Sequence, residues 1–458
     1  MKEKIIYECS ECGYLSPKWM GKCPNCGEWN TLSEKKEIKG QKKAALRDKP
    51  VLSRLAQIEN REDARICTGI SEFDRVLGGG MVRDSVTILT SPPGGGKSTL
   101  ALMAACETAK QGFRVLYASG EESETQIKSR ADRILGIIEE NIWILADTSM
   151  DAVLAAIEEI QADLIILDSI QTFALAEYYP ARAGNPTQTM ECASALVQCA
   201  KNKKTPRAVL MIGQMNKNDE IAGLRALEHL VDTVLVMEGE GADELRGLTA
   251  TKNRFGSTGE MGFFSMTEKG LVSIDNPSLY FITKRSREQA VSGSALTVLR
   301  EGSRAVVAEV ESLVSRSFSP YPSRISESMK RETLHTLLSI LEQRGGIQLH
   351  DKDVVVKTTG GLRLKEQAAN LAVLMSILSS AKEKPLPPDW AFIADVGLTG
   401  ELKKVPGLES RIRELDRMGY SCVVTAQNVA PSVEYAHIRV AECRTLSEVI
   451  RLIFPGKR

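Results

Sequence analysis

The stretch Ser91-Pro92-Pro93-Gly94-Gly95-Gly96-Lys97-Ser98-Thr99 decides how this chain folds. It lies between the apolar run at residues 86–90, which predicts a buried strand, and residues 100–105, which predict a helix. A glycine-rich loop between a strand and a helix binds phosphate, because its backbone N–H groups can turn toward an anion without a Cβ clash. The stretch therefore predicts a nucleoside-triphosphate site, with Lys97 on the β- and γ-phosphates and Ser98 on Mg²⁺.

The loop departs from the usual phosphate-binding pattern at its first position. That pattern opens with glycine five residues before its second glycine, and this chain has Ser91 there. The prolines that follow make this part of the loop stiffer, whereas the three glycines, Lys97 and Ser98 stand where phosphate contacts are needed. An ordinary glycine-rich turn before a lysine is the alternative. The strand and the helix on the correct sides favour the nucleotide site.

Composition limits the class of protein. The 458 residues are enough for two or three domains. The 59 lysines and arginines equal the 59 aspartates and glutamates, so a nucleic-acid surface would have to be a local patch. No apolar run is long enough to cross a membrane, and the amino terminus has no signal-type core, which predicts a cytoplasmic protein with no membrane partner.

Two Cys-x-x-Cys pairs near the amino terminus predict a metal site. Cys9 and Cys12 form the first pair, and Cys23 and Cys26 form the second. Four thiolates with this spacing suit tetrahedral Zn²⁺, and residues 1–32 are too few to build a hydrophobic core without a metal. Two disulfides or a redox pair are alternatives, which the cytoplasmic setting disfavours. We therefore expect a zinc finger at residues 1–32.

The sequence leaves the role of this zinc module open. Its loop carries basic and aromatic side chains, namely Lys18, Trp19, Lys22 and Trp29. Such a mixture can bind nucleic acid, and the two tryptophans can equally cover the metal site. Residues 33–60, rich in Lys, Gln and Glu, are expected to be a flexible linker.

The region assigned to residues 61–287 alternates strand and helix patterns from Thr68 onward. Such alternation predicts an α/β fold with a parallel sheet covered by helices on both faces. The expected strands lie at residues 86–90, 114–119, 142–146, 164–168, 208–214 and 233–238. Ligands of such sheets bind at the carboxyl ends of strands, so polar residues there are candidates for function.

Three strand ends supply candidate catalytic residues. Asp168 closes an apolar strand and suits Mg²⁺. Glu121 and Glu122 follow another strand, and one of the two can orient the attacking water, although the sequence does not decide which. Gln214 ends a third strand, where its amide can sense the γ-phosphate. Helix capping or solvation explains each residue alone, and their shared position favours a joint catalytic role.

Four stretches carry a resemblance to a known family: Phe73-Asp74-Arg75-Val76-Leu77-Gly78-Gly79-Gly80, Lys97-Ser98-Thr99, residues 119–123 and, most specifically, Lys252-Asn253-Arg254-Phe255-Gly256. Over almost its whole length the chain resembles RadA (Sms), a family of bacterial RecA-like DNA-repair ATPases. The resemblance implies a homo-hexameric ring that binds single-stranded and branched DNA, hydrolyses ATP and drives branch migration of recombination intermediates. It also implies recombinase and helicase partners.

Lys252 and Arg254 are two residues apart on an expected strand, so they project to one side. In a ring they could reach a neighbouring subunit's γ-phosphate and act in catalysis; a basic strand edge in solvent is the alternative. Two loops are candidates for DNA contacts or for subunit contacts: residues 174–189, with Tyr178, Tyr179 and Arg182, and residues 216–225, with Lys217 and Arg225.

The chain departs from the family pattern at two more positions. Gln214 stands where the family has histidine and is more similar to RecA itself. Met190 stands where an arginine is common, which weakens the case for a basic pore loop at residues 174–189.

Residues 288–458 mix expected amphipathic helices at 332–341, 366–379 and 408–418 with strands at 353–358 and 422–425. Gly360-Gly361-Leu362, Ser379-Ser380 and Gly397-Leu398-Thr399-Gly400-Glu401 resemble the catalytic domain of Lon protease. A Lon-type site needs a serine and a lysine, and their places fall at Ala368 and Glu409, so we expect an inactive α+β scaffold.

Three functional hypotheses follow from these observations. The leading one is a DNA-dependent ATPase of recombinational repair. An ATP-dependent Lon-type protease is the second, which Ala368 disfavours because alanine has no nucleophile. The third is a non-motor switch ATPase that docks repair partners through its terminal domains.

Overall fold

The computed structural model describes residues 4–9, 15–16, 18–24, 27–29, 31–37, 54, 65–214, 224–239, 244–428 and 435–455. The chain divides into two compact units, Met1–Glu62 and Asp63–Arg458. None of the helices in the described ranges is both long and apolar enough to span a bilayer.

The first unit contains a small antiparallel sheet. Its strands are β1 (Lys4–Cys9), β2 (Leu15–Ser16) and β3 (Leu32–Glu37), in the order β2-β1-β3. Residues 33–37, which were expected to belong to a flexible linker, instead form β3, which pairs with β1 along its full length. The pairing of β1 with β3 brings Leu32 opposite Cys9, so β3 is part of the sheet of the amino-terminal module.

The second unit begins with a nine-stranded sheet among its described residues, in the order β14-β13-β12-β11-β6-β10-β9-β7-β8. The six predicted strands are confirmed to within one residue at each end, and they are all parallel: β6 (Val86–Ser91), β7 (Val115–Ser119), β8 (Ile142–Ala146), β9 (Leu164–Asp168), β10 (Ala208–Gln214) and β11 (Thr233–Glu238). Three antiparallel strands extend the sheet beyond β11: β12 (Leu245–Asn253), β13 (Met261–Thr267) and β14 (Gly270–Ser273).

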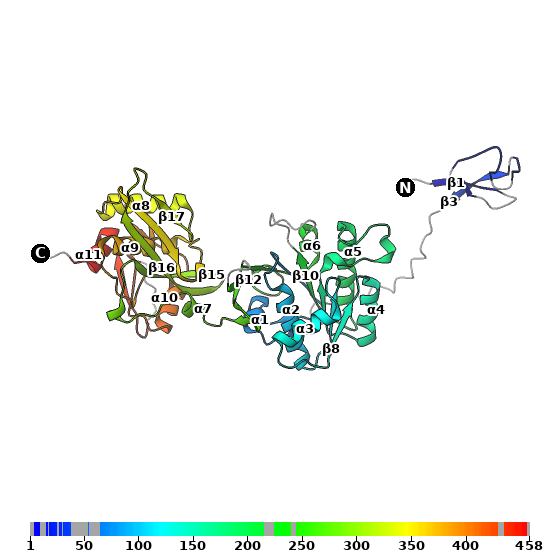
Figure 1. The fold of residues 1–458 in the computed structure, drawn as a ribbon, viewed down its shortest axis with the longest axis horizontal. Coiled ribbons are helices and arrows are strands. Elements are labelled where there is room, and N and C mark those ends of the chain that lie inside the picture. The colour runs from blue at the N-terminus through cyan, green and yellow to red at the C-terminus, as the bar shows by residue number, and fades with distance from the viewer. Residues whose placement is uncertain are drawn as a thin grey trace. The chain divides into compact units, whose positions relative to one another are not determined.

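Helices cover both faces of this sheet (Figure 1). Successive strand residues alternate between two hydrophobic cores, as Ile88 and Leu89 do in β6. One core receives α1 (Ser71–Leu77), α2 (Lys97–Lys110) and α3 (Glu124–Ile134). The other core receives α4 (Met150–Ile160), α5 (Pro186–Ala200) and α6 (Leu224–Leu230). The predicted α/β architecture is therefore confirmed.

A mixed sheet follows, with seven strands among the described residues in the order β17-β18-β16-β15-β19-β22-β23. These strands are β15 (Ser294–Glu301), β16 (Arg304–Arg316), β17 (Arg324–Ser326), β18 (Lys352–Thr358), β19 (Trp390–Phe392), β22 (Cys422–Ala426) and β23 (Arg439–Cys443). Its main helices are α8 (Arg331–Gly345), α9 (Asn370–Lys382), α10 (Leu408–Arg417) and α11 (Leu446–Ile453). The expectation of an amphipathic helix at 366–379 is wrong, because α9 is buried all round from Leu371 to Ser379.

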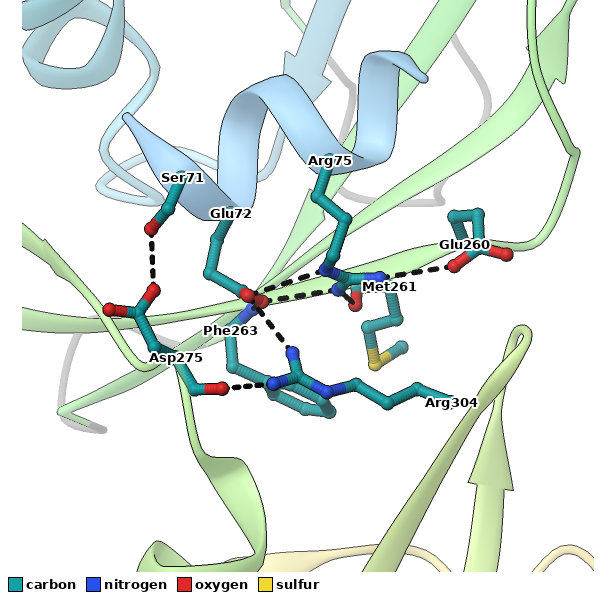
Figure 2. Close-up of polar contacts among 8 residues, drawn as sticks. All are labelled: Ser71, Glu72, Arg75, Glu260, Met261, Phe263, Asp275 and Arg304. Carbon is teal, nitrogen blue, oxygen red and sulfur yellow. Dashed lines mark hydrogen bonds and ion pairs between the residues drawn. The ribbon is translucent and has the colours of Figure 1, made fainter. Parts of the chain in front are cut away.

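The two sheets of the second unit share a buried junction. The ring of Phe263 in β13 packs edge-on against Phe281 with a centroid separation of 5.5 Å, inside the core of the second sheet. Figure 2 shows the polar part of the junction, where the buried carboxylate of Glu72 in α1 accepts hydrogen bonds from Arg75, from Arg304 at 2.9 Å and from the backbone N–H of Phe263 at 2.9 Å. The boundary expected near residue 287 is thus bridged by a common core and a charged cluster.

Candidate active site

The predicted phosphate loop joins the end of β6 to the start of α2. Strand β6 is buried along its whole length and ends at Ser91, and α2 begins at Lys97. Gly96 has a φ of 99° and is the N-cap of α2, so no side chain there competes for the first N–H groups of the helix. A Cβ at Gly96 would lie 2.7 Å from Cε of Met266. The helix terminus can therefore present its N–H groups to an anion.

The ammonium of Lys97 lies inside this loop. Its Nζ donates to the carbonyl oxygen of Ser91 at 3.1 Å, to the Ser91 hydroxyl at 3.0 Å and to the carbonyl oxygen of Pro92 at 3.5 Å. Burial lowers the pKa of Lys97 below its ordinary value, and the charges of Asp168 and Glu121 oppose this shift. Both carboxylates are therefore close enough to act on the lysine charge.

Asp168 is fixed by a tyrosine that the sequence analysis missed. The carboxylate is buried at the end of β9, and the hydroxyl of Tyr117 in β7 donates to its Oδ2 at 2.8 Å. Burial, together with the neighbouring Asp168, raises the pKa of Tyr117 well above its ordinary value, so the phenol stays a donor. A fixed, buried carboxylate beside a phosphate loop is a suitable ligand for Mg²⁺, with the Ser98 hydroxyl at the start of α2 as the second candidate ligand.

The two adjacent glutamates have different surroundings. Oε1 of Glu121 accepts hydrogen bonds from Nε2 of Gln214 at 2.7 Å and from the hydroxyl of Ser169. Residues that end or follow β7, β9 and β10 thus meet at one carboxylate. Glu122 instead forms an ion pair with Arg130 of α3, while its Oε2 is buried without a partner among the described residues. The Glu121 carboxylate therefore contacts the other candidate residues, whereas the charge of Glu122 is paired with Arg130 of α3.

The chain is similar to known proteins both in two separate regions and over its full length. Residues 7–34 match the rubredoxin metal binding domain, and residues 53–220 match the AAA domain. DNA repair protein RadA of Bacillus subtilis (strain 168) is 39% identical over 464 residues, which cover 99% of this chain and 100% of that relative. The protein of the same name from Pseudomonas aeruginosa (strain PAO1) is 37% identical over 457 residues, or 99% of each chain. The chain belongs to the RadA family of DNA repair proteins.

Two solved structures match about half of this RadA-family protein. The ATPase domain of G40P has 14% identity and a TM-score of 0.40, with 47% of this chain and 94% of that chain covered. The RadB recombinase has 20% identity and a TM-score of 0.36, with 46% and 100% covered.

In this RadA-family chain, Lys252 and Arg254 lie at the end of the sheet where the parallel strands begin, whereas the phosphate loop lies at the end where those strands finish. Asn253 pairs with Thr233, which in turn pairs with Thr87 near the start of β6, whereas the loop follows the end of that strand. Nζ of Lys252 donates to the carbonyl oxygen of Val231 at 2.8 Å. Arg254 forms a 3.0 Å ion pair with the buried Asp232. The structure therefore does not bring these two cations to the ATP site of their own chain.

The candidate DNA loops are only partly described. In the loop at 174–189, the Tyr179 side chain is 84% exposed and Arg182 is exposed as well. Residues 216–223 of the other candidate loop lie outside the described residues, as do the side chains at 224 and 225. Met190 packs against the core that α4 and α5 share, so the residue that replaces the usual arginine is a hydrophobic contact of the fold.

The zinc module is also only partly described. Cys12 and Cys26 lie outside the described residues, Cys9 is in β1 and Cys23 is buried. The two tryptophans are 56% and 68% exposed at Trp19 and Trp29, and Nζ of Lys22 lies 5.5 Å from the Trp29 ring centroid. Both tryptophans therefore have most of their surface in solvent.

The places assigned to a Lon-type serine and lysine cannot perform acyl transfer. Ala368 is buried just before α9. Glu409 lies on the exposed face of α10, where its carboxylate accepts a 2.6 Å hydrogen bond from Arg413. Neither residue supplies a nucleophile or a base of the required kind.

Proposed function

We propose that this RadA-family protein is a DNA-stimulated ATPase that works as a homo-hexameric ring on single-stranded and branched DNA and promotes branch migration of recombination intermediates. The observation that carries the proposal is the convergence of Asp168, Glu121 and Gln214 beside Lys97 at one edge of the sheet. An edge with a phosphate loop, a buried carboxylate and a second carboxylate has the parts that phosphoryl transfer to water requires.

In this proposal each residue has a distinct role. The loop from Ser91 to Thr99 and the ammonium of Lys97 bind the triphosphate. Ser98 and Asp168 would hold Mg²⁺, which neutralises charge on the β- and γ-phosphates when it is bound. Glu121 accepts the proton of the attacking water. Gln214, at the end of β10, donates a hydrogen bond to the same carboxylate, so a change in the charge of Glu121 alters a contact of β10.

A ring would explain why Lys252 and Arg254 lie away from the phosphate loop of their own chain. In a head-to-tail ring, one edge of each subunit faces the other edge of its neighbour. The two cations would then approach the neighbour's γ-phosphate, and Arg254 would have to leave or share Asp232. Burial lowers the pKa of Lys252, and the adjacent Arg254 contributes a smaller shift in the same direction.

The first experiment measures ATP turnover with no DNA, with single-stranded DNA and with a branched junction, alongside sizing in the presence of nucleotide. We expect DNA to raise kcat, and we expect this stimulation to fall steeply with salt because phosphate contacts release counterions. Lys97→Ala is the inactive control. Turnover that ignores both DNAs at low salt would replace the motor by a switch ATPase.

The second experiment mixes Lys252→Ala with wild-type protein. If Lys252 acts on a neighbour's nucleotide, the variant reduces activity more than in proportion to its share of the subunits. Lys201→Ala is a control for the loss of a nearby cation, because Nζ of Lys201 pairs at 3.1 Å with the Asp232 that also pairs with Arg254, and Lys201 lies outside the Lys252–Gly256 stretch. A strictly proportional loss in the Lys252→Ala mixtures would contradict the role across subunits.

A further inference from the structure

The first position of the phosphate loop has a side chain in an unusual place. Ser91 is fully buried, and its backbone is fixed by pairing with Gln214 of β10. Its hydroxyl donates to the carbonyl oxygen of Pro92 at 2.7 Å, so its proton is already used. The lone pairs of the same oxygen accept from Nζ of Lys97 at 3.0 Å.

This hydroxyl completes the coordination of the Lys97 ammonium. An ammonium has three N–H donors, and here three loop oxygens receive them: the Ser91 carbonyl, the Ser91 hydroxyl and the Pro92 carbonyl. A loop that opens with glycine offers the two carbonyl oxygens only. A phosphate oxygen must therefore displace one more contact of Lys97 in this chain than in a chain with glycine at the first position.

The rest of the loop is adapted to the serine. An ideal Cβ at Gly95 would lie 2.4 Å from the Ser91 hydroxyl oxygen and 2.7 Å from the Ser91 Cβ. The Ser91 side chain thus fills the space that a side chain at position 95 would need. Gly95 has no positive φ that would itself require glycine. A serine at position 91 therefore requires a glycine at position 95, because the two positions share one space in the loop.

We propose that Ser91 is a positioning residue that holds Lys97 back against the loop and thereby weakens the affinity of this chain for nucleotide. The inference rests on the proposed ATP site and adds a property to it. Because hydrogen bonds to a charged group are among the stronger ones, we expect removal of the hydroxyl to tighten nucleotide binding about tenfold, or about 1.4 kcal/mol. Tighter binding is a result that mere damage to the loop would not produce.

The test is equilibrium binding of the fluorescent analogue mant-ADP, with Mg²⁺ at a fixed concentration, to the full-length chain. Ser91→Ala should bind more tightly than wild type. Thr90→Val is the matched control, since it removes a buried hydroxyl one residue away that donates instead to the carbonyl oxygen of Leu235 at 3.2 Å, and it should leave affinity unchanged. In a Lys97→Ala background, Ser91→Ala should have no further effect.

The outcomes separate the inference from the proposed function. If wild-type protein does not bind mant-ADP, the ATP site itself is refuted. If wild type binds and Ser91→Ala binds equally or more weakly, the role of Ser91 is overturned. A second pair of variants keeps the packing argument testable: Gly95→Ala should weaken binding in wild type and be rescued by Ser91→Gly. An equal effect of Gly95→Ala in both backgrounds would contradict this requirement.

Discussion

Replacing Glu121 by glutamine tests the proposed base with little disturbance of the residues around it. The amide oxygen of glutamine can still accept the hydrogen bonds from Gln214 and Ser169. The other carboxylate oxygen becomes an NH₂ group, which cannot take a proton from water. A positioned base contributes about 10²–10⁴-fold in rate, or about 2.7–5.4 kcal/mol in the barrier. The kcat of Glu121→Gln should therefore be lower than that of wild type by about 10²–10⁴-fold.

Glu122→Gln is the control that the adjacent residue provides. Glu122 pairs with Arg130 and both side chains are only 22–28% exposed, so loss of the charge should cost about 1–3 kcal/mol of folding free energy. We expect its kcat to stay within about threefold of wild type, because the Glu122 carboxylate pairs with Arg130 of α3 rather than with the residues that surround Glu121.

The assay is steady-state ATP hydrolysis at saturating ATP and DNA, with mant-ATP binding measured in parallel. Both variants should bind mant-ATP as wild type does, so that any loss lies in the chemical step. Near-normal turnover by Glu121→Gln together with a hundredfold loss in Glu122→Gln would reverse the assignment. Normal turnover by both would remove the carboxylate pair from the mechanism.

Three further predictions concern stability and metals. Tyr117→Phe removes the hydrogen bond that fixes Asp168, so the Mg²⁺ concentration for half-maximal turnover should rise about tenfold, with kcat retained at saturating Mg²⁺; an unchanged Mg²⁺ requirement would contradict this role. Arg304→Ala should lower the free energy of unfolding in urea by about 1.5–3 kcal/mol, because Glu72 keeps its other partners but loses one charged hydrogen bond; a loss below about 0.5 kcal/mol would contradict the junction. Metal analysis should return one zinc per chain, and protein that contains no zinc while all four amino-terminal thiols are reactive would contradict the zinc module.

Local patterns in the sequence predicted the six parallel strands and the phosphate loop, because a buried parallel strand reads as an unbroken apolar run and the loop has its own glycine signature. The role of Tyr117 was not predicted, because within the apolar run of β7 a tyrosine looks like an ordinary core aromatic. The hydrogen bond from its hydroxyl to Asp168 depends on the pairing of β7 with β9. Ser169 was missed for a similar reason, since its partner Glu121 is 48 residues away.

The difference between Glu121 and Glu122 could not be predicted from the sequence. The two adjacent carboxylates are equivalent in the sequence, and only the position of α3 in the fold brings Arg130 to Glu122. The junction around Glu72 was equally inaccessible, because Arg304 is 232 residues away in the chain and no local periodicity reports such a contact. The burial of α9 on all sides likewise depends on strands contributed from both of its flanks.

Helix α1 is only seven residues long, about 10 Å, yet it is attached at both ends. Near its carboxyl end, the amide of Asn253 donates to the carbonyl oxygen of Leu77 at 3.3 Å, within the same Lys252–Gly256 stretch that carries the two cations. Near its amino end, Glu72 is bonded to Arg304 of the second sheet. Helix α1 therefore connects the Lys252–Gly256 stretch to the second sheet through contacts near its two ends.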